Sequence, residues 1–256
     1  MGQDRRGFLK LAGLAAVCAT ARESLTRLAG AADTEPQPAA KGPKVRWAMV
    51  VDPRRCLEQQ NCAACIDACD HAHNLPVFTN PRHEVKWIWK TRFDEAFPDQ
   101  DSRYIDPALT SEAVLALCNH CDNPPCVRVC PTQATWKRDD GIVAMDWHRC
   151  IGCRYCMAAC PYGSRSFNWE DPRPHIAHEN PDFPTRTKGV VEKCTFCNER
   201  IDRGELPACV VACQEKALVF GDLNDPDSEV RRLLRTRFAL RRRAGLGTQP
   251  EVFYLV

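Results

Sequence analysis

The chain has 256 residues, and its 35 basic and 33 acidic side chains leave a formal net charge of +2, which gives no electrostatic support for nucleic-acid binding. No run of about eighteen or more apolar residues occurs, so we expect no membrane-spanning helix. The chain is also long enough to bury an ordinary core without a disulfide framework, so its seventeen cysteines need another explanation.

The N-terminus predicts export of a folded protein. Residues 4–10 read Asp-Arg-Arg-Gly-Phe-Leu-Lys, a twin-arginine pattern, and a weakly apolar stretch follows at 11–21. We expect a Tat signal peptide over 1–32, with the mature protein in the periplasm; the alternative is a short amphipathic helix of the mature protein. Cys18 falls inside this segment and is expected to bind no metal. A Pro/Ala-rich linker is expected over 33–44.

The first cysteine group follows directly on a predicted strand. Val45–Asp52 has strand character, and the four cysteines come after it. They are Cys56, Cys62, Cys65 and Cys69. The first gap holds five residues, which makes Cys56 one of the two least secure ligands. In the insertion over 71–117, Trp87 and Trp89 are expected to be packing anchors, because large aromatic side chains usually supply buried area.

The next two groups have the spacing of ferredoxin cluster loops. They are Cys118, Cys121, Cys126 and Cys130, and then Cys150, Cys153, Cys156 and Cys160. The latter group continues into Pro161 and reads C-x2-C-x2-C-x3-C-P, the run that wraps a cubane cluster in bacterial ferredoxins. The fourth cysteine of such a run ligates the neighbouring cluster, so the groups are expected to work in pairs. Between them, Ala134–Lys137 and Ile142–Met145 predict a hairpin.

The fourth group repeats the same order of strand, cysteine loop and strand. It consists of Cys194, Cys197, Cys209 and Cys213, with eleven residues before Cys209, the other less secure ligand. Val190–Val191 and Ala217–Phe220 are candidate strands on either side. The proline-rich segment 164–189 is expected to be an ordered surface loop or a partner contact. Farther on, Val230–Arg243 predicts a basic helix that docks on lipid headgroups or lies in solvent, and Val252–Val256 predicts a last strand or interface segment.

Other cysteine chemistries fit less well. Disulfide frameworks belong to short exported domains. Structural zinc sites have two separated C-x2-C pairs, which the compact third group does not match. No C-x-x-C is followed by histidine, which excludes c-type haem attachment. None of the seven histidines has a convincing metal-ligand spacing.

Four basic residues lie next to or near the predicted ligands. They are Arg149, Arg154, Arg165 and Lys193. Such residues either tune cluster potentials or lie in solvent, and the sequence favours solvated surface charges.

Several segments resemble the four-cluster iron-sulfur subunits found with molybdenum oxidoreductases and quinone-linked membrane complexes. They are His73–Pro76, Glu84–Trp89, Leu117–Cys126, Asn180–Gly189 and Leu246–Pro250. In these segments the chain is most similar to the O subunit, the periplasmic iron-sulfur subunit, of the dissimilatory sulfite reduction (Dsr) membrane complex.

The resemblance implies an α+β fold of two nested 2[4Fe-4S] ferredoxin-like modules. It implies four cluster ligand sets, namely Cys56, Cys62, Cys65 and Cys213; Cys69, Cys194, Cys197 and Cys209; Cys118, Cys121, Cys126 and Cys160; and Cys130, Cys150, Cys153 and Cys156. The expected organisation is a signal peptide over 1–32, a linker over 33–44, the first half of the outer module with its insertion over 45–117, the inner module over 118–189, the second half of the outer module over 190–221, and a basic helix and tail over 222–256.

The expected function is a relay of single electrons through four [4Fe-4S] clusters, with no substrate transformed by the chain itself. The resemblance implies a quinone-interacting membrane subunit, a multihaem cytochrome c and further complex subunits as partners in sulfite or sulfur metabolism. One alternative is the electron-transfer subunit of a periplasmic molybdopterin enzyme such as a tetrathionate or polysulfide reductase. Another is a metal-stabilised scaffold without redox activity.

Overall fold

The computed structural model describes residues 45–59, 61–100, 107 and 113–256. The predicted signal peptide, the linker and Cys18 therefore lie outside the described residues. Within the described part of the chain, no helix is both long and apolar enough to cross a membrane.

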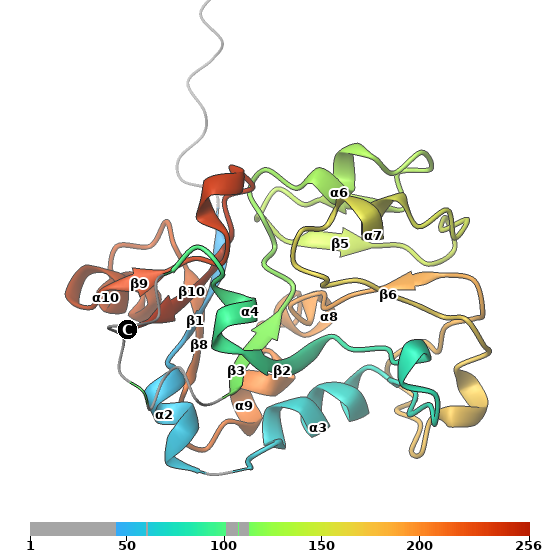
Figure 1. Ribbon diagram of the computed structural model, residues 1–256, viewed down its shortest axis with the longest axis horizontal. Helices are drawn as coiled ribbons and strands as arrows, with labels where there is room; N and C mark the ends of the chain where they lie inside the picture. The colour runs from blue at the N-terminus through green and yellow to red at the C-terminus, as the bar shows by residue number, and fades with distance from the viewer. Residues whose placement is uncertain (1–44, 60, 101–106, 108–112) are drawn as a thin grey trace, which may run out of the picture. The chain divides into compact units, whose positions relative to one another are not determined.

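A four-stranded sheet joins the beginning and the end of the described chain (Figure 1). Its order is β8 (Leu218–Asp222), β1 (Trp47–Val51), β10 (Val252–Leu255) and β9 (Ala239–Leu240). Strand β1 pairs antiparallel with β8 and parallel with β10. Because β1 leads into the first cysteine group and β8 follows the fourth, this pairing brings the two groups to the same end of the sheet. The strands predicted at 45–52, 217–220 and 252–256 are confirmed.

The other strands of the described residues form three antiparallel pairs. They are β2 (Ile88–Arg92) with β3 (Ala113–Leu117), β4 (Thr135–Lys137) with β5 (Val143–Met145), and β6 (Ser166–Phe167) with β7 (Val191–Glu192). The predicted hairpin is the β4–β5 pair. Its turn contains Gly141, whose φ of +89° favours glycine because glycine has no Cβ atom to clash there.

Short helices carry the cysteines or follow them (Figure 1). The α-helices are α2 (Pro53–Glu58), α3 (Ala64–Ala72), α4 (Phe93–Ala96), α6 (Pro125–Arg128), α7 (Tyr155–Ala159), α8 (Asn198–Ile201), α9 (Ala208–Ala212) and α10 (Glu229–Thr236), and the 3-10 turns are η1 (Pro81–His83), η3 (Arg173–His175) and η4 (Ala244–Leu246). Helix α3 packs against α9, and α6 packs against α7. Each packed pair joins two cysteine groups: the first with the fourth, and the second with the third.

The main core lies between these elements and includes Trp87, which is 1% exposed and confirms the predicted packing role. The segment 164–189 contributes to the core as well, since Phe183 and Arg186 are buried, so it is not only a surface loop. Close packing also explains Gly152 within the third group. A Cβ atom there would lie 2.3 Å from the carbonyl oxygen of Gly189, too close for any other residue.

The basic helix is shorter than predicted. Helix α10 ends at Thr236, whereas the sequence predicts a helix as far as Arg243. Arg237 is extended, and Ala239–Leu240 pair with β10 as strand β9. Pairing with the free edge of β10 satisfies backbone groups that a longer helix would leave at an open sheet edge, so tertiary structure overrides the helical pattern. Arg237 also forms an ion pair with Asp52 at the end of β1.

Candidate functional site

Cysteines from distant parts of the chain line three separate cavities. The first has about 470 Å³ of empty space, part of it open to solvent, and its lining includes Cys56, Cys62, Cys65 and Cys213. The second has about 340 Å³, and its lining includes Cys118, Cys121, Cys126 and Cys160. The third has about 290 Å³, and its lining includes Cys130, Cys150, Cys153 and Cys156. In each cavity three cysteines come from one group and the fourth comes from another.

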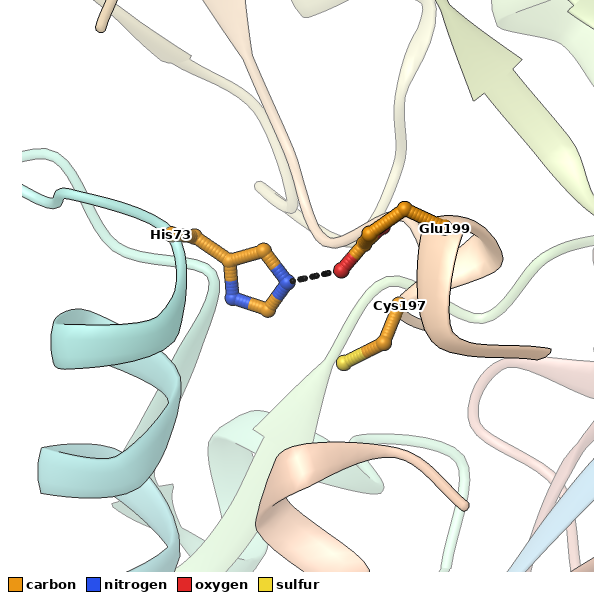
Figure 2. Close-up of side chains that lie close together, drawn as sticks. All are labelled: His73, Cys197 and Glu199. Carbon is orange, nitrogen blue, oxygen red and sulfur yellow. Dashed lines mark hydrogen bonds and ion pairs between the residues drawn. The ribbon is translucent and has the colours of Figure 1, made fainter. Parts of the chain in front are cut away.

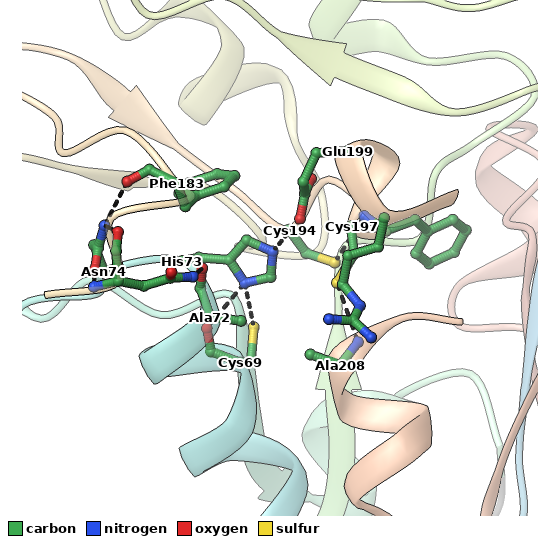
Figure 3. Close-up of polar contacts among 12 residues, drawn as sticks. Cys69, Ala72, His73, Asn74, Phe183, Cys194, Cys197, Glu199 and Ala208 are labelled. Carbon is green, nitrogen blue, oxygen red and sulfur yellow. Dashed lines mark hydrogen bonds and ion pairs between the residues drawn. The ribbon is translucent and has the colours of Figure 1, made fainter. Parts of the chain in front are cut away.

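A fourth set of cysteines is buried and comes from α3, from the chain before α8 and from α9. Burial raises the pKa of Cys69 well above its usual range, and the nearby thiols of Cys194, Cys209 and Cys197 raise it further. Figure 3 shows Cys69 at the end of α3, opposite Cys194 and Cys197 from the chain around α8. The structure therefore brings these four cysteines together as well. Both less secure residues, Cys56 and Cys209, lie with their expected groups.

Backbone N–H groups point at several of these sulfur atoms. Phe196 N donates to Cys194 Sγ at 3.4 Å, and Ala208 N donates to Cys197 Sγ at 3.4 Å. Cys213 accepts from Ala217 N at 3.2 Å. Hydrogen bonds to sulfur stabilise a thiolate and are one way in which proteins tune iron-sulfur clusters.

The electrostatics of the cysteine sets suit a bound metal centre. Burial and then neighbouring thiols raise the pKa of Cys65 to about 12 and that of Cys121 to about 12, so four such thiols do not ionise together without a compensating positive charge. Cys130 differs: burial raises its pKa, but hydrogen bonds from Thr135, Thr132 and the backbone outweigh burial and the net shift is downward. All sixteen described cysteines are free of disulfides.

The chemistry of the cavity walls fits an iron-sulfur cluster. The cavities combine four sulfur atoms with mainly apolar walls, such as Val51, Leu115 and Leu218 in the first. Soft thiolate ligands select iron-sulfur clusters, zinc or copper(I) over hard cations such as magnesium and calcium. The residues present therefore fit the group that the cysteine spacing predicts.

Adjacent cysteine sets approach one another at three points. Burial is the largest cause of the raised pKa of Cys209, Cys194 and Cys156. The charge on Cys65 contributes to the raised pKa of Cys209, that on Cys118 to the raised pKa of Cys194, and that on Cys126 to the raised pKa of Cys156. Because charge interactions weaken with distance, the sets that they connect are neighbours, in the order first cavity, buried fourth set, second cavity and third cavity. The third cavity is the accessible end, because Cys153 is exposed.

One histidine that the sequence did not single out lies against the buried fourth set (Figure 2). His73 is 1% exposed; its Nδ1 lies 2.9 Å from the carbonyl oxygen of Cys69 and 3.5 Å from Cys69 Sγ, and its Nε2 lies 3.1 Å from Glu199 Oε1. Only its position four residues after Cys69, at the end of a helix, could have indicated this contact.

The side chains of His73, Cys197 and Glu199 also lie close enough to hold a metal ion, with their ligand atoms within 4.8 Å of one another. Both ring nitrogens of His73 are already engaged, and Cys197 belongs to the buried cysteine set. We therefore interpret His73 and Glu199 as polar neighbours of that set.

The four basic residues near the cysteines fall into two pairs. Arg149 and Arg154 are exposed, as the sequence favours. Arg165 is 5% exposed and Lys193 is 0% exposed, so the expectation of solvated charges is wrong for both. Each is buried because the polar atoms of its head group meet protein acceptors: Arg165 donates to Thr135 Oγ1 at 2.9 Å, and Lys193 donates to the carbonyl oxygen of Cys194 at 2.6 Å.

Comparisons with known proteins agree with this chemistry. Residues 110–174 and 180–223 match the 4Fe-4S dicluster domain. The chain is 43% identical to the Hdr-like menaquinol oxidoreductase iron-sulfur subunit 1 of Archaeoglobus fulgidus, over 98% of this chain and 97% of that protein. It is 37% identical to the B subunit of tetrathionate reductase from Salmonella typhimurium, over 100% of this chain and 89% of that protein.

A third relative is the iron-sulfur cluster-binding subunit of menaquinone reductase from Nitratidesulfovibrio vulgaris, which is 36% identical over 83% of this chain and 89% of that protein. Two of these relatives are named as iron-sulfur subunits of oxidoreductases, and the three cover between 83% and 100% of this chain. The chain therefore belongs to the family of ferredoxin-type [4Fe-4S] subunits that transfer electrons within oxidoreductase complexes and are not themselves the catalytic subunit.

Proposed function

We propose that the chain carries four [4Fe-4S] clusters on sixteen cysteines and relays single electrons between a quinone-interacting membrane subunit and other redox subunits of a membrane complex. The observation that carries the proposal is the grouping of the cysteines. Each of the three cavities is lined by four cysteines from two sequence groups, and the remaining four are buried together. These groupings have the composition that the family resemblance implies for the four ligand sets, which supports the assignment.

The same grouping supports two nested ferredoxin-like modules. The outer module combines the first and fourth groups, and the inner module combines the second and third. Support comes from the pairing of β1 with β8 and from the packing of α3 on α9 and of α6 on α7.

The protein residues hold, insulate and connect the redox centres. Bound [4Fe-4S] clusters supply reversible one-electron chemistry. The thiolates fix their positions, the N–H groups that face sulfur stabilise negative charge, and the apolar walls limit water. The approaches of Cys209 to Cys65, and of Cys156 to Cys126, support a single continuous path from the first cavity to the exposed third cavity.

The relatives and the N-terminal sequence support the proposed partners and compartment. Two relatives are named for menaquinol or menaquinone, which supports a quinone-linked membrane complex. The twin-arginine pattern at 4–10 supports export to the periplasm with the clusters already in place, because metal ligation is part of the folding free energy. Within this class we propose the Dsr membrane complex of sulfite and sulfur metabolism, with a multihaem cytochrome c as a further partner.

A molybdopterin oxidoreductase is the second candidate, and the similarity to the tetrathionate reductase protein over the whole chain favours it. Purification of the native complex from detergent-solubilised membranes separates the two. Co-purification with a multihaem cytochrome and a membrane subunit supports the Dsr assignment, whereas a large molybdopterin subunit overturns it.

The cluster assignment is tested on the purified holoprotein by iron and sulfide analysis and by EPR during reductive titration. We expect four reducible clusters. Cys153→Ser should remove one, while Cys18→Ser, which changes the seventeenth cysteine, should leave all four. Zinc in place of iron, with no reducible EPR signal, would establish the non-redox scaffold, and four intact clusters in Cys153→Ser would refute the ligand assignment.

A further inference from the structure

The buried carboxylates of the described residues are all neutralised by arginine. Asp52 pairs with Arg237, Glu192 with Arg186, and Glu251 with Arg46. This follows the general rule that a buried charge needs a partner, because removal from water is costly.

Arg165 departs from that rule. It is 5% exposed and forms no ion pair with any carboxylate in the part of the chain that the structure describes. Its side chain lines the second cavity, and its guanidinium interacts with Cys126, Cys156 and Cys118. On its other side, Nη2 donates to Thr135 Oγ1 at 2.9 Å, and Thr135 lines the third cavity. Arg165 therefore lies in the wall between the two cavities.

Lys193 is a second buried cation without a carboxylate partner among the described residues. It is 0% exposed, and its ammonium group donates to the carbonyl oxygens of Cys194 and Val143. Val143 lines the second cavity, and Cys194 belongs to the buried fourth set. Lys193 therefore lies between these two sites, as Arg165 lies between the second and the third.

The other sites have less favourable charge around them. The fourth set is near Lys193 but also near Asp70 and Glu199, which oppose added negative charge. At the first cavity, the cation near Cys56 is Lys90, whose charge favours the thiolate form of Cys56. Lys90 is exposed, so water screens its charge. At the third cavity, Arg165 lies behind Thr135 as a buried cation, and the Arg154 in the cavity lining is exposed. The second cavity alone lies between two buried cations.

Reduction adds one negative charge to a cluster, and a nearby cation in a low-dielectric wall stabilises that charge much more than a solvated one does. We propose that Arg165 and Lys193 are tuning residues that make the site of Cys118, Cys121, Cys126 and Cys160 the electron sink of the chain. Its cluster has the highest reduction potential of the four and is reduced first. The inference rests on the cluster assignment proposed above.

Potentiometric titration of the holoprotein, followed by EPR, tests this order. The first signal to appear on reduction should be the one that is missing in Cys121→Ser. In Arg165→Gln, the equilibrium constant for reduction of that cluster should fall by about tenfold or more. This lowers its reduction potential by about 59 mV or more for a one-electron step. Arg165→Lys keeps the charge and should recover most of the loss. Arg149 is next to Cys150, and its side chain is 64% exposed. Arg149→Gln should therefore change the same equilibrium constant for reduction by less than about threefold.

Iron content separates the possible failures. If the wild-type protein binds no iron-sulfur clusters, the proposed function fails and the inference fails with it. If four clusters are present but the signal missing in Cys121→Ser is not the first to appear, or if Arg165→Gln leaves its potential unchanged, the inference alone is overturned. If Arg165→Gln does not fold, Lys193→Gln is measured instead and should lower the reduction potential of the same cluster. An unchanged potential in Lys193→Gln would also overturn the inference.

Discussion

Two buried arginines, Arg186 and Arg165, occupy very different environments. Arg186 forms an ion pair with Glu192 at 2.8 Å, with both side chains 0% exposed, and it also donates to the backbone carbonyl oxygens of His73 and Asn74. Arg165 faces cysteine sulfur and no carboxylate of the described chain. A buried cation that is paired within the protein, such as Arg186, has its counter-charge in the fold itself. On the cluster assignment proposed above, the counter-charge of Arg165 is the cluster site of the second cavity.

The environment of Arg186 connects two distant segments. Its guanidinium lies among the rings of Trp87, Trp147 and Phe183. Glu192 accepts from Trp87 Nε1 at 3.2 Å. Together, Arg186, Glu192 and these three rings connect the end of α3 to the strand before the fourth cysteine group. These contacts therefore help to hold Cys69 opposite Cys194.

Removal of iron should give the largest difference between the region around Arg165 and the region around Arg186. Burial raises the pKa of Cys121 and Cys160 in the second cavity, so without a bound cluster these thiols are neutral. Arg165 then has less counter-charge, and the adjoining β4–β5 hairpin should open. Arg186 keeps Glu192. Hydrogen exchange after chelation should therefore become about tenfold faster or more at β4 and β5, with a smaller change at β7. Equal loss of protection in both regions would contradict the distinction.

Breaking the buried ion pair should give the next largest effect. Glu192→Ala leaves Arg186 buried and unpaired, and we expect a loss of about 3–5 kcal/mol in the free energy of unfolding of the holoprotein. Urea denaturation followed by fluorescence and cluster absorbance measures it. Glu205→Ala, which breaks an exposed ion pair with Arg203, is the matched control and should cost far less. Similar losses in both variants would show that Arg186 is not held by Glu192.

A smaller effect is expected from the hydrogen bonds that attach the segment 180–186 to α3. Asn74 Nδ2 donates to the carbonyl oxygens of Asn180 and Phe183, and Asn74 Oδ1 accepts from Asn180 N. Figure 3 shows the contact between Asn74 and Phe183. Asn74→Ala removes all three, and we expect a loss of about 1–3 kcal/mol by the same denaturation assay. Asn74→Asp keeps the acceptor for Asn180 N but places a carboxyl oxygen against two carbonyl oxygens in a buried site, so it should lose at least as much stability as Asn74→Ala. An Asn74→Ala protein as stable as wild type would show that this attachment contributes nothing.

The features predictable from the sequence are those that rest on local spacing. The cysteine spacing identified the groups, apolar strand-forming residues indicated the strands at 45–52 and 142–145, and Gly141 marked the turn between β4 and β5. Neither the ion pair of Arg186 with Glu192 nor the approach of His73 to Glu199 has a local pattern, since the latter pair is 126 residues apart in the sequence. The burial of Arg165 could not be predicted either. An arginine five residues after a predicted ligand cysteine can be buried or exposed to solvent, and the local sequence does not distinguish the two. Long-range packing decides it.

The exposed pair of Arg138 and Asp202 should give the smallest effect and provides the solvent-exposed contrast to Arg186. The hydrogen bond from Arg138 lowers the pKa of Asp202 below its usual 3.8, although burial opposes the shift. A carboxylate with a lowered folded-state pKa adds stability above its unfolded pKa and loses it as pH falls through the folded value. Because Asp202 is 52% exposed, solvent screening limits the contribution to about 0.5 kcal/mol or less. A double-mutant cycle of Arg138→Gln and Asp202→Asn should show this coupling at pH 7 and a progressive loss below pH 3.8. A coupling as large as the loss in Glu192→Ala would remove the contrast between a solvated arginine pair and a buried one.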